Sequence, residues 1–133
     1  MKRRILVVDD EDPILELVTK VLKEDYAVDT ARDGIEALDK LQQSKYNILL
    51  TDIVMPNMDG LTLLKKAREL DPFIQVIVMT GYLSVDITLE CLENGANEYV
   101  LKPFNIMDVK KLIKIAVERI DRWEEAVRQT IKK

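Results

Sequence analysis

The sequence predicts an α/β domain in which five helices cover a doubly wound sheet of five parallel strands, in the order 2-1-3-4-5. Apolar runs of strand length alternate five times with longer segments that have helical periodicity. Capping and turn residues separate these segments and leave connections of only a few residues. Because crossovers between parallel strands are right-handed, this alternation places helices on both faces of the sheet. The 133 residues suffice for one such domain with a buried core.

The first strand is predicted over Ile5–Val8, a continuous apolar run typical of a parallel strand that is buried on both faces. A helix should follow directly, with Asp12 as its N-cap and Pro13 as its first helical residue. Apolar side chains recur at steps of three and four residues after Pro13, which indicates that one face of this helix packs on the sheet.

The second and third strands are predicted over Tyr26–Ala31 and Ile48–Asp52. Between them, Asp33 and Glu36 have the spacing of a capping box at the start of the second helix. Asp59 should cap the third helix, which an aspartate-proline pair ends.

The second half of the chain continues the alternation. A fourth strand is predicted over Gln75–Met79, followed by a helix that Ser84 caps. Gly95 should end that helix in the left-handed conformation. The fifth strand covers Glu98–Leu101, and Asn105 can cap a long final helix.

Composition argues against several classes of function. The net charge is −4 and the isoelectric point is about 5.0, so we expect no nucleic-acid binding by this segment, because such surfaces need a basic excess. The chain contains no histidine, which removes imidazole catalysis and histidine metal ligands. The only cysteine, Cys91, cannot form an internal disulfide and fits a core residue in a reducing compartment. The apolar run before Asp9 is too short for a signal peptide or membrane span, so we expect a soluble, cytoplasmic protein.

Five functional side chains follow the predicted strands at the edge where the carboxyl ends of the strands meet. They are Asp9 and Asp10 after the first strand, Asp52 on the third, Thr80 on the fourth and Lys102 on the fifth. Three neighbouring carboxylates repel one another unless they raise a pKa, bind a cation or accept a lysine. Oxygen ligands without histidine or clustered cysteine favour a hard ion, and Mg²⁺ commonly takes one or two carboxylates.

An aspartate beside Mg²⁺ can attack a phosphoryl donor and become an aspartyl phosphate. Lys102 and the Thr80 hydroxyl would then contact the new phosphoryl oxygens on Asp52, because phosphoryl transfer depends on positioning and charge neutralisation. Each residue alone also has an ordinary interpretation, since paired acids can cap a helix, a lysine can lie on the surface and a threonine can end a strand. Their joint placement at one sheet edge favours a site.

Four motifs in this order resemble the receiver domain of two-component response regulators, whose fold is flavodoxin-like. The motifs are Val7-Val-Asp-Asp-Glu11, Asp52 with Met55-Pro-Asn-Met-Asp-Gly60, Thr80-Gly81, and Gly95-Ala96 leading to Tyr99-Val-Leu-Lys-Pro-Phe104. The resemblance covers nearly all of the chain from Ile5 to about Ile120. Each motif alone is weak, but four in the right order and spacing make coincidence a poor explanation.

The resemblance implies that Asp52 is the phosphoacceptor and that the phosphoryl donor is a phosphohistidine of a sensor histidine kinase or phosphotransfer protein. It also implies a Mg²⁺ site in which Asp10 binds directly and Asp9 binds largely through water. Asp52 and the backbone carbonyl of Val54 would complete the protein ligands. Such a module catalyses its own phosphorylation and dephosphorylation and is not an enzyme in the usual sense.

The resemblance further implies a switch. Thr80 would move toward the phosphoryl group and Tyr99 would rotate inward, which remodels the face formed by the fourth helix, fifth strand and fifth helix. The Lys102–Pro103 peptide is expected to be cis. Val54 and Tyr82 occupy two positions that tune the lifetime of the phosphate in the family. Neither side chain easily orients an attacking water, so we expect slow hydrolysis.

The sequence is compatible with two other functions. A magnesium-dependent phosphohydrolase also uses a strand-end aspartyl nucleophile, but it usually needs a second aspartate two residues later, where this chain has Val54. A receiver-like scaffold that is not phosphorylated is the weakest interpretation, because the acids, Thr80 and Lys102 are all present.

The last helix contains a seam of alternating four- and three-residue steps, which is typical of a coiled coil. The seam consists of Val109, Ile113, Ala116, Ile120, Trp123, Val127 and Thr130. A continuous helix over 106–131 would be roughly 39 Å long, too long to pack wholly on one small sheet. We therefore predict a receiver domain over 1–120 and a helical extension over 121–133 that serves a homodimer or a link to an output domain. The alternative is a core helix with a frayed tail.

Overall fold

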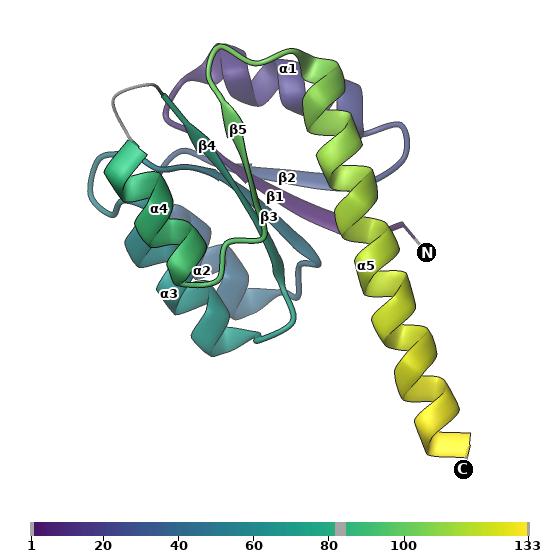
Figure 1. The fold of residues 1–133 in the computed structure, drawn as a ribbon. Coiled ribbons are helices and arrows are strands. Elements are labelled where there is room, and N and C mark those ends of the chain that lie inside the picture. Colours follow the sequence, from purple (N-terminus) through teal and green to yellow (C-terminus); the bar gives the residue numbers. More distant parts are fainter. Residues whose placement is uncertain (1, 82–84, 133) are drawn as a thin grey trace.

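A parallel sheet of five strands forms the middle layer of the molecule (Figure 1). The computed structural model describes residues 2–81 and 85–132. The strand order β2-β1-β3-β4-β5 confirms the predicted doubly wound topology. The strands are β1 (Arg4–Val8), β2 (Ala27–Ala31), β3 (Ile48–Asp52), β4 (Gln75–Thr80) and β5 (Glu98–Leu101). The helices are α1 (Asp12–Leu22), α2 (Gly34–Gln43), α3 (Gly60–Leu70), α4 (Val85–Glu93) and α5 (Ile106–Lys132).

Helices α1 and α5 cover one face of the sheet, and α2, α3 and α4 cover the other (Figure 1). Alternate residues of β1 supply the two cores: Ile5 and Val7 pack with α1 and α5, whereas Leu6 and Val8 pack with the other three helices. This explains why the strand reads as a continuous apolar run rather than an alternating one. Burying each such side chain contributes about 1.5–3 kcal/mol relative to leaving it exposed.

The start of α1 differs from the prediction. Glu11, not Asp12, is the N-cap, and its side chain makes no capping hydrogen bond. The carboxylate of Asp9 accepts a hydrogen bond from the Glu11 backbone N–H at 2.9 Å, which turns the chain into the helix one residue early. Asp12 therefore becomes the first helical residue, and its carboxylate pairs with Arg32 at 3.0 Å.

The capping box of α2 forms only in part. Asp33 accepts a hydrogen bond from the Glu36 backbone N–H at 2.8 Å, as predicted. The Glu36 side chain, however, accepts from the N–H of Arg32 at 3.1 Å rather than from that of Asp33. The backbone N–H that Glu36 contacts is thus one residue closer to the amino terminus than in a capping box.

Other predicted helix ends are confirmed. Asp59 accepts a hydrogen bond from the N–H of Thr62 at 2.8 Å, and Asn105 accepts one from the N–H of Met107 at 2.9 Å. Gly95 has a φ of 101°, a conformation that a residue with a Cβ rarely adopts. The predicted Ser84 cap lies outside the described residues.

Helix α5 is continuous over its 27 residues and runs past the edge of the sheet, so that its last turns project from the domain (Figure 1). Its buried residues are Val109, Ile113, Ala116 and Ile120. Trp123 and Val127, the next seam positions, are 41% and 57% exposed. Arg3 ties the projecting part to the domain through Asp121 at 2.6 Å and Glu124 at 2.7 Å. In the part of the chain that the structure describes, helices are all too short or too polar to cross a bilayer.

Candidate functional site

The candidate site residues lie at one edge of the sheet because the central strands are in register at their carboxyl ends. Val8 on β1 pairs with Thr51 on β3, and Thr80 on β4 pairs with Leu101 on β5. The residues that follow these strands, or end them, therefore stand at the same height on one edge of the sheet. This edge includes the point where the strand order reverses, which is where open α/β sheets commonly bind ligands.

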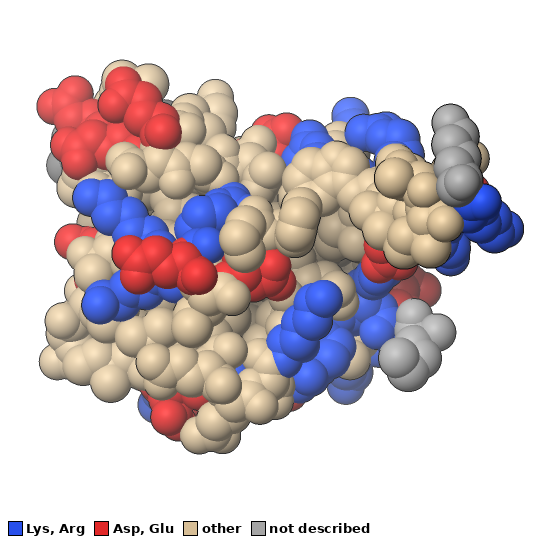
Figure 2. Space-filling model, turned by 90° about the horizontal axis from the view of Figure 1, so that it is seen from below, with Lys and Arg blue, Asp and Glu red and all other residues tan. Residues whose placement is uncertain are grey.

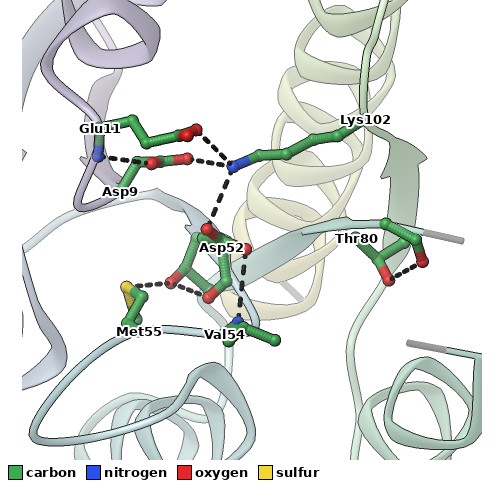
Figure 3. A network of polar contacts seen from close by, with 9 residues as sticks. Asp9, Glu11, Asp52, Val54, Met55, Thr80 and Lys102 are labelled. Atoms are coloured by element: carbon green, nitrogen blue, oxygen red, sulfur yellow. Dashed lines mark hydrogen bonds and ion pairs between the residues drawn. The ribbon is translucent and has the colours of Figure 1, made fainter. Parts of the chain in front are cut away.

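Lys102 holds two of the acids together (Figure 3). Its Nζ lies 2.7 Å from Asp9 Oδ2 and 3.1 Å from Asp52 Oδ2. Glu11 adds a third carboxylate at 3.6 Å. An ammonium group has three N–H donors, so it can serve Asp9 and Asp52 at the same time. The predicted cis Lys102–Pro103 peptide is confirmed.

The three predicted acids are close enough to share one cation. Ligand oxygens of Asp9, Asp10 and Asp52 all lie within 4.8 Å of one another. Asp9 is fully buried, Asp52 is 8% exposed and Asp10 faces solvent. Such a set contains only oxygen donors and leaves one side open to water, which suits Mg²⁺ because that ion keeps several water or phosphate ligands.

Burial and charge act in opposite directions on the paired groups. Burial raises the pKa of Asp9 above its usual value, although hydrogen bonds from Lys102 and from the Glu11 N–H act to lower it. Burial acts to lower the pKa of Lys102, but hydrogen bonds to Asp9 and Asp52 outweigh this effect and raise it. Lys102 therefore stays cationic at neutral pH and compensates the buried carboxylate.

The loop after β3 fixes the backbone of Asp52. A Cβ on Gly60 would overlap the Asp52 carbonyl and come within 2.7 Å of Ile53 Cα, so only glycine permits this approach of α3. The Gly60 N–H donates to the Ile53 carbonyl at 2.7 Å. The Val54 N–H donates to Asp52 Oδ1 at 3.3 Å, which orients the carboxylate. Asn57 has a positive φ of 71°, which asparagine tolerates, and completes the turn.

Thr80 lies at the same sheet edge, but its hydroxyl group points elsewhere. The hydroxyl is 2.7 Å from that of Thr88 on α4 and donates to the Gly81 carbonyl at 3.3 Å. Figure 3 shows Thr80 apart from the group formed by Lys102 and Asp52. Tyr99 on β5 is 47% exposed. Tyr82, the second position expected to tune phosphate lifetime, lies outside the described residues.

Two residues of this region, Glu11 and Thr88, were assigned no function from the sequence. Glu11 follows the acid pair directly, and its place in an unbroken acidic run was the available signal. Thr88 stands one helical turn before the buried Cys91 on the apolar face of α4, so a polar residue in an apolar stripe could have marked it. The contact between Thr88 and Thr80 is visible only in the three-dimensional structure.

The sequence and the fold match those of known proteins. The sequence model of the response regulator receiver domain matches residues 5–114. Sporulation initiation phosphotransferase F of Bacillus subtilis (strain 168) is 36% identical over 115 residues, which cover 86% of this chain and 93% of that protein. Against some other curated relatives, transcriptional regulatory proteins among them, the chain spans less than a third of their length, for example 29%.

Solved structures agree over the whole fold. A receiver domain protein from Methanospirillum hungatei JF-1 has a TM-score of 0.85 and 37% identity, covering 94% of this chain and 98% of that chain. A structure described as an adenylate cyclase from Rhodopirellula baltica has a TM-score of 0.92 and 27% identity, covering 100% of both chains. The chain therefore belongs to the family of response regulator receiver domains of two-component signal transduction.

Proposed function

We propose that this receiver domain accepts a phosphoryl group on Asp52 from a phosphohistidine of a partner kinase or phosphotransfer protein. The observation that carries the proposal is the position of the Lys102 ammonium group between Asp9 and Asp52, at 2.7 Å and 3.1 Å. Two carboxylates and one ammonium group leave the site with a net negative charge. A negatively charged phosphoryl group can therefore bind there only if further positive charge arrives with it.

In the proposed reaction an oxygen of Asp52 attacks the phosphorus atom and forms a P–O bond. The P–N bond to the donor imidazole breaks, its electron pair returns to the nitrogen, and that nitrogen takes up a proton from the solvent. Lys102 is within reach of the new phosphoryl oxygens and neutralises part of their charge. The chain would thus catalyse its own phosphorylation and later hydrolysis without turning over a free substrate.

A divalent ion completes the proposed site. Asp9, Asp10, Asp52 and the backbone carbonyl of Val54 would hold Mg²⁺, and the shared reach of the three carboxylates supports this assignment. When bound, Mg²⁺ would offset the charge of the carboxylates and of the incoming phosphoryl oxygens. The chain's own contribution is to hold Asp52 in place through the Val54 N–H and the close packing of Gly60.

The proposed output is a change of packing around Thr80 and Tyr99. Thr80 would turn toward the phosphoryl group, and Tyr99 would move into the space that it leaves. The affected face already exposes apolar side chains, among them Val85 and Leu89 on α4 and Leu101 on β5. A phosphoryl group can shift this equilibrium only by as much as it binds one packing better than the other.

We propose that the extension predicted over 121–133, of which the structure describes 121–132 as part of α5, pairs with the same segment of a second copy. Ile120 is the last buried residue of the helix, which supports a receiver domain over 1–120. Trp123 and Val127 continue the spacing of the buried seam and leave apolar surface exposed. Figure 2 shows acidic and basic side chains interspersed on the face seen from below, a pattern that suits pairing between copies better than binding to a phosphate backbone. We place the protein in the cytoplasm, where its phosphohistidine partners act and its single cysteine stays reduced.

The proposal is tested by incubating the chain with Mg²⁺ and phosphoramidate and measuring the intact mass. The wild type should gain one phosphoryl group, and the Asp52→Asn variant should gain none, because an amide is a poor nucleophile. Omission of Mg²⁺ should strongly slow the gain. An unmodified wild type, or an equal gain by the variant, would refute the assignment of Asp52.

A further inference from the structure

A hydrogen bond between the buried hydroxyl groups of Thr80 and Thr88 links the sheet to α4. Their Oγ1 atoms lie 2.7 Å apart, and the residues are 2% and 8% exposed. Thr80 ends β4 at the functional edge, whereas Thr88 lies in the first turns of α4. The hydroxyl that is proposed to contact a phosphoryl group is therefore already engaged on the opposite side.

A hydroxyl group has a single proton, so Thr80 cannot donate to a phosphoryl oxygen and keep its present contacts unchanged. Rotation or movement of Thr80 toward Asp52 would lengthen its bond to Thr88. Both residues are buried, so the hydrogen bond between their hydroxyl groups stabilises the present position of Thr80. The bond to Thr88 thus opposes the movement of Thr80 that the proposed switch requires.

We propose that Thr88 is a positioning residue that holds the Thr80 hydroxyl on α4 and so opposes phosphoryl binding in the unmodified chain. This inference rests on the proposed phosphorylation of Asp52. It assigns to Thr88 the link between the site and the α4 surface, because movement of Thr80 removes one attachment of α4 to the sheet.

A cavity lies next to this pair and would change shape if Thr80 moved. Its volume is about 360 Å³, and Thr80, Thr88 and Tyr99 are among its lining residues. Departure of the Thr80 side chain from this wall would enlarge the space that Tyr99 is proposed to enter. The hydrogen bond between the two threonines therefore affects both the position of Thr80 at the site and the space available to Tyr99.

The test compares Thr88→Val, which keeps the shape of the side chain but lacks the hydroxyl, with Thr88→Ser, which keeps the hydroxyl. The probe is beryllium fluoride with saturating Mg²⁺, measured by isothermal titration calorimetry. Loss of one neutral hydrogen bond from the unmodified packing should tighten the apparent affinity of Thr88→Val by about fivefold. Thr88→Ser should bind like the wild type.

A double-mutant cycle with Thr80→Val isolates the pair. In the Thr80→Val background the effect of Thr88→Val should vanish, because the bond is already absent. Urea unfolding provides a second readout: Thr88→Val should unfold more easily than the wild type and still bind the probe more tightly. A purely structural role cannot produce that combination.

The outcomes separate the inference from the function on which it rests. Equal or weaker probe binding by Thr88→Val, beside normal binding by the wild type, would overturn the role of Thr88 and leave phosphorylation of Asp52 intact. Tighter binding that persists in the Thr80→Val background would also overturn it. If the wild type and Asp52→Asn respond alike to the probe, both proposals fail.

Discussion

The ammonium group of Lys102 lies 2.7 Å from the carboxylate of Asp9, although 93 residues separate them in the chain. Asp9 is fully buried, so its negative charge has to be compensated within the protein. Lys102 provides this compensation and at the same time reaches Asp52. Lys102 is therefore the group through which the chain itself holds Asp9 and Asp52 together.

Replacing Lys102 by methionine should destabilise the chain and make it depend on Mg²⁺. The variant leaves the buried Asp9 carboxylate without its cation, which lowers the free energy of unfolding. Because the Lys102 side chain is 20% exposed, we expect a loss of about 2 kcal/mol, below the range for a fully buried pair. Mg²⁺ should restore more stability to the Lys102→Met variant than to the wild type, because its carboxylates no longer have a competing cation. Urea unfolding with and without Mg²⁺ measures both effects.

The exposed Lys114 on α5 offers a matched control, since Lys114→Met removes the same charge away from the site. That variant should unfold like the wild type, with and without the ion. The interpretation of Lys102 is wrong if Lys102→Met shows the same stability and the same response to Mg²⁺ as this control.

Replacing Val54 by asparagine should speed the loss of phosphate severalfold. Val54 is 62% exposed and follows Asp52 by two residues, so it can shield an acyl phosphate but cannot orient a water molecule. An amide side chain at this position can hold the attacking water. The decay of phosphorylated chain, followed by intact mass, measures the rate. Val54→Ala serves as the control for lost shielding, and equal rates for the alanine and asparagine variants would contradict the expected role of a positioned water.

The Cys91 thiol should make stability depend on alkaline pH. Burial raises its pKa from 9.0 to about 11, so between these values the unfolded chain ionises while the folded chain does not. The stabilisation is complete below pH 9 and is lost as the pH rises through about 11. Urea unfolding at successive pH values should show this loss in the wild type and a shallower loss in Cys91→Ala. Identical slopes would show that the thiol ionises equally in both states.

Most of the sheet could be predicted because its three central strands, β1, β3 and β4, are buried on both faces and read as apolar runs. The predicted and observed strand bounds agree at Ile48–Asp52 and Glu98–Leu101, and each of the other three strands differs by one residue at one end. The functional edge was also predictable, because the order of the strands determines which strand ends meet. For that reason Asp9 and Lys102 could be brought together from the sequence alone.

Contacts that depend on side-chain direction could not be predicted in the same way. The guanidinium group of Arg68 contacts the carbonyls of Ile74 and Gly95 and the side chain of Asn97, which joins α3 to two later segments. Nothing in the local pattern of α3 distinguishes Arg68 from a solvated residue. The orientation of the Thr80 hydroxyl toward α4 is a further example, since sequence spacing places the residue but not its rotamer.

The pairing of two α5 helices should depend on Val127. A charge at this exposed seam position should abolish self-association, because a carboxylate cannot be buried between two apolar helix faces. Sedimentation velocity of the phosphorylated chain should show a dimer for the wild type and a monomer for Val127→Glu. Gln129→Glu adds the same charge outside the seam and should leave the dimer intact. Self-association of Val127→Glu equal to that of Gln129→Glu would exclude this helix face as the interface.

The position of the phosphoryl group is the most direct test of the proposed function. Borohydride reduces an aspartyl phosphate to a homoserine, which peptide mass spectrometry locates in the sequence. After treatment with phosphoramidate and Mg²⁺, the chain should yield homoserine at position 52 and at no other aspartate. Modification of Asp9 or Asp10 instead, or no reducible phosphate at all, would contradict the proposal that Lys102 and the neighbouring acids prepare Asp52 for phosphoryl transfer.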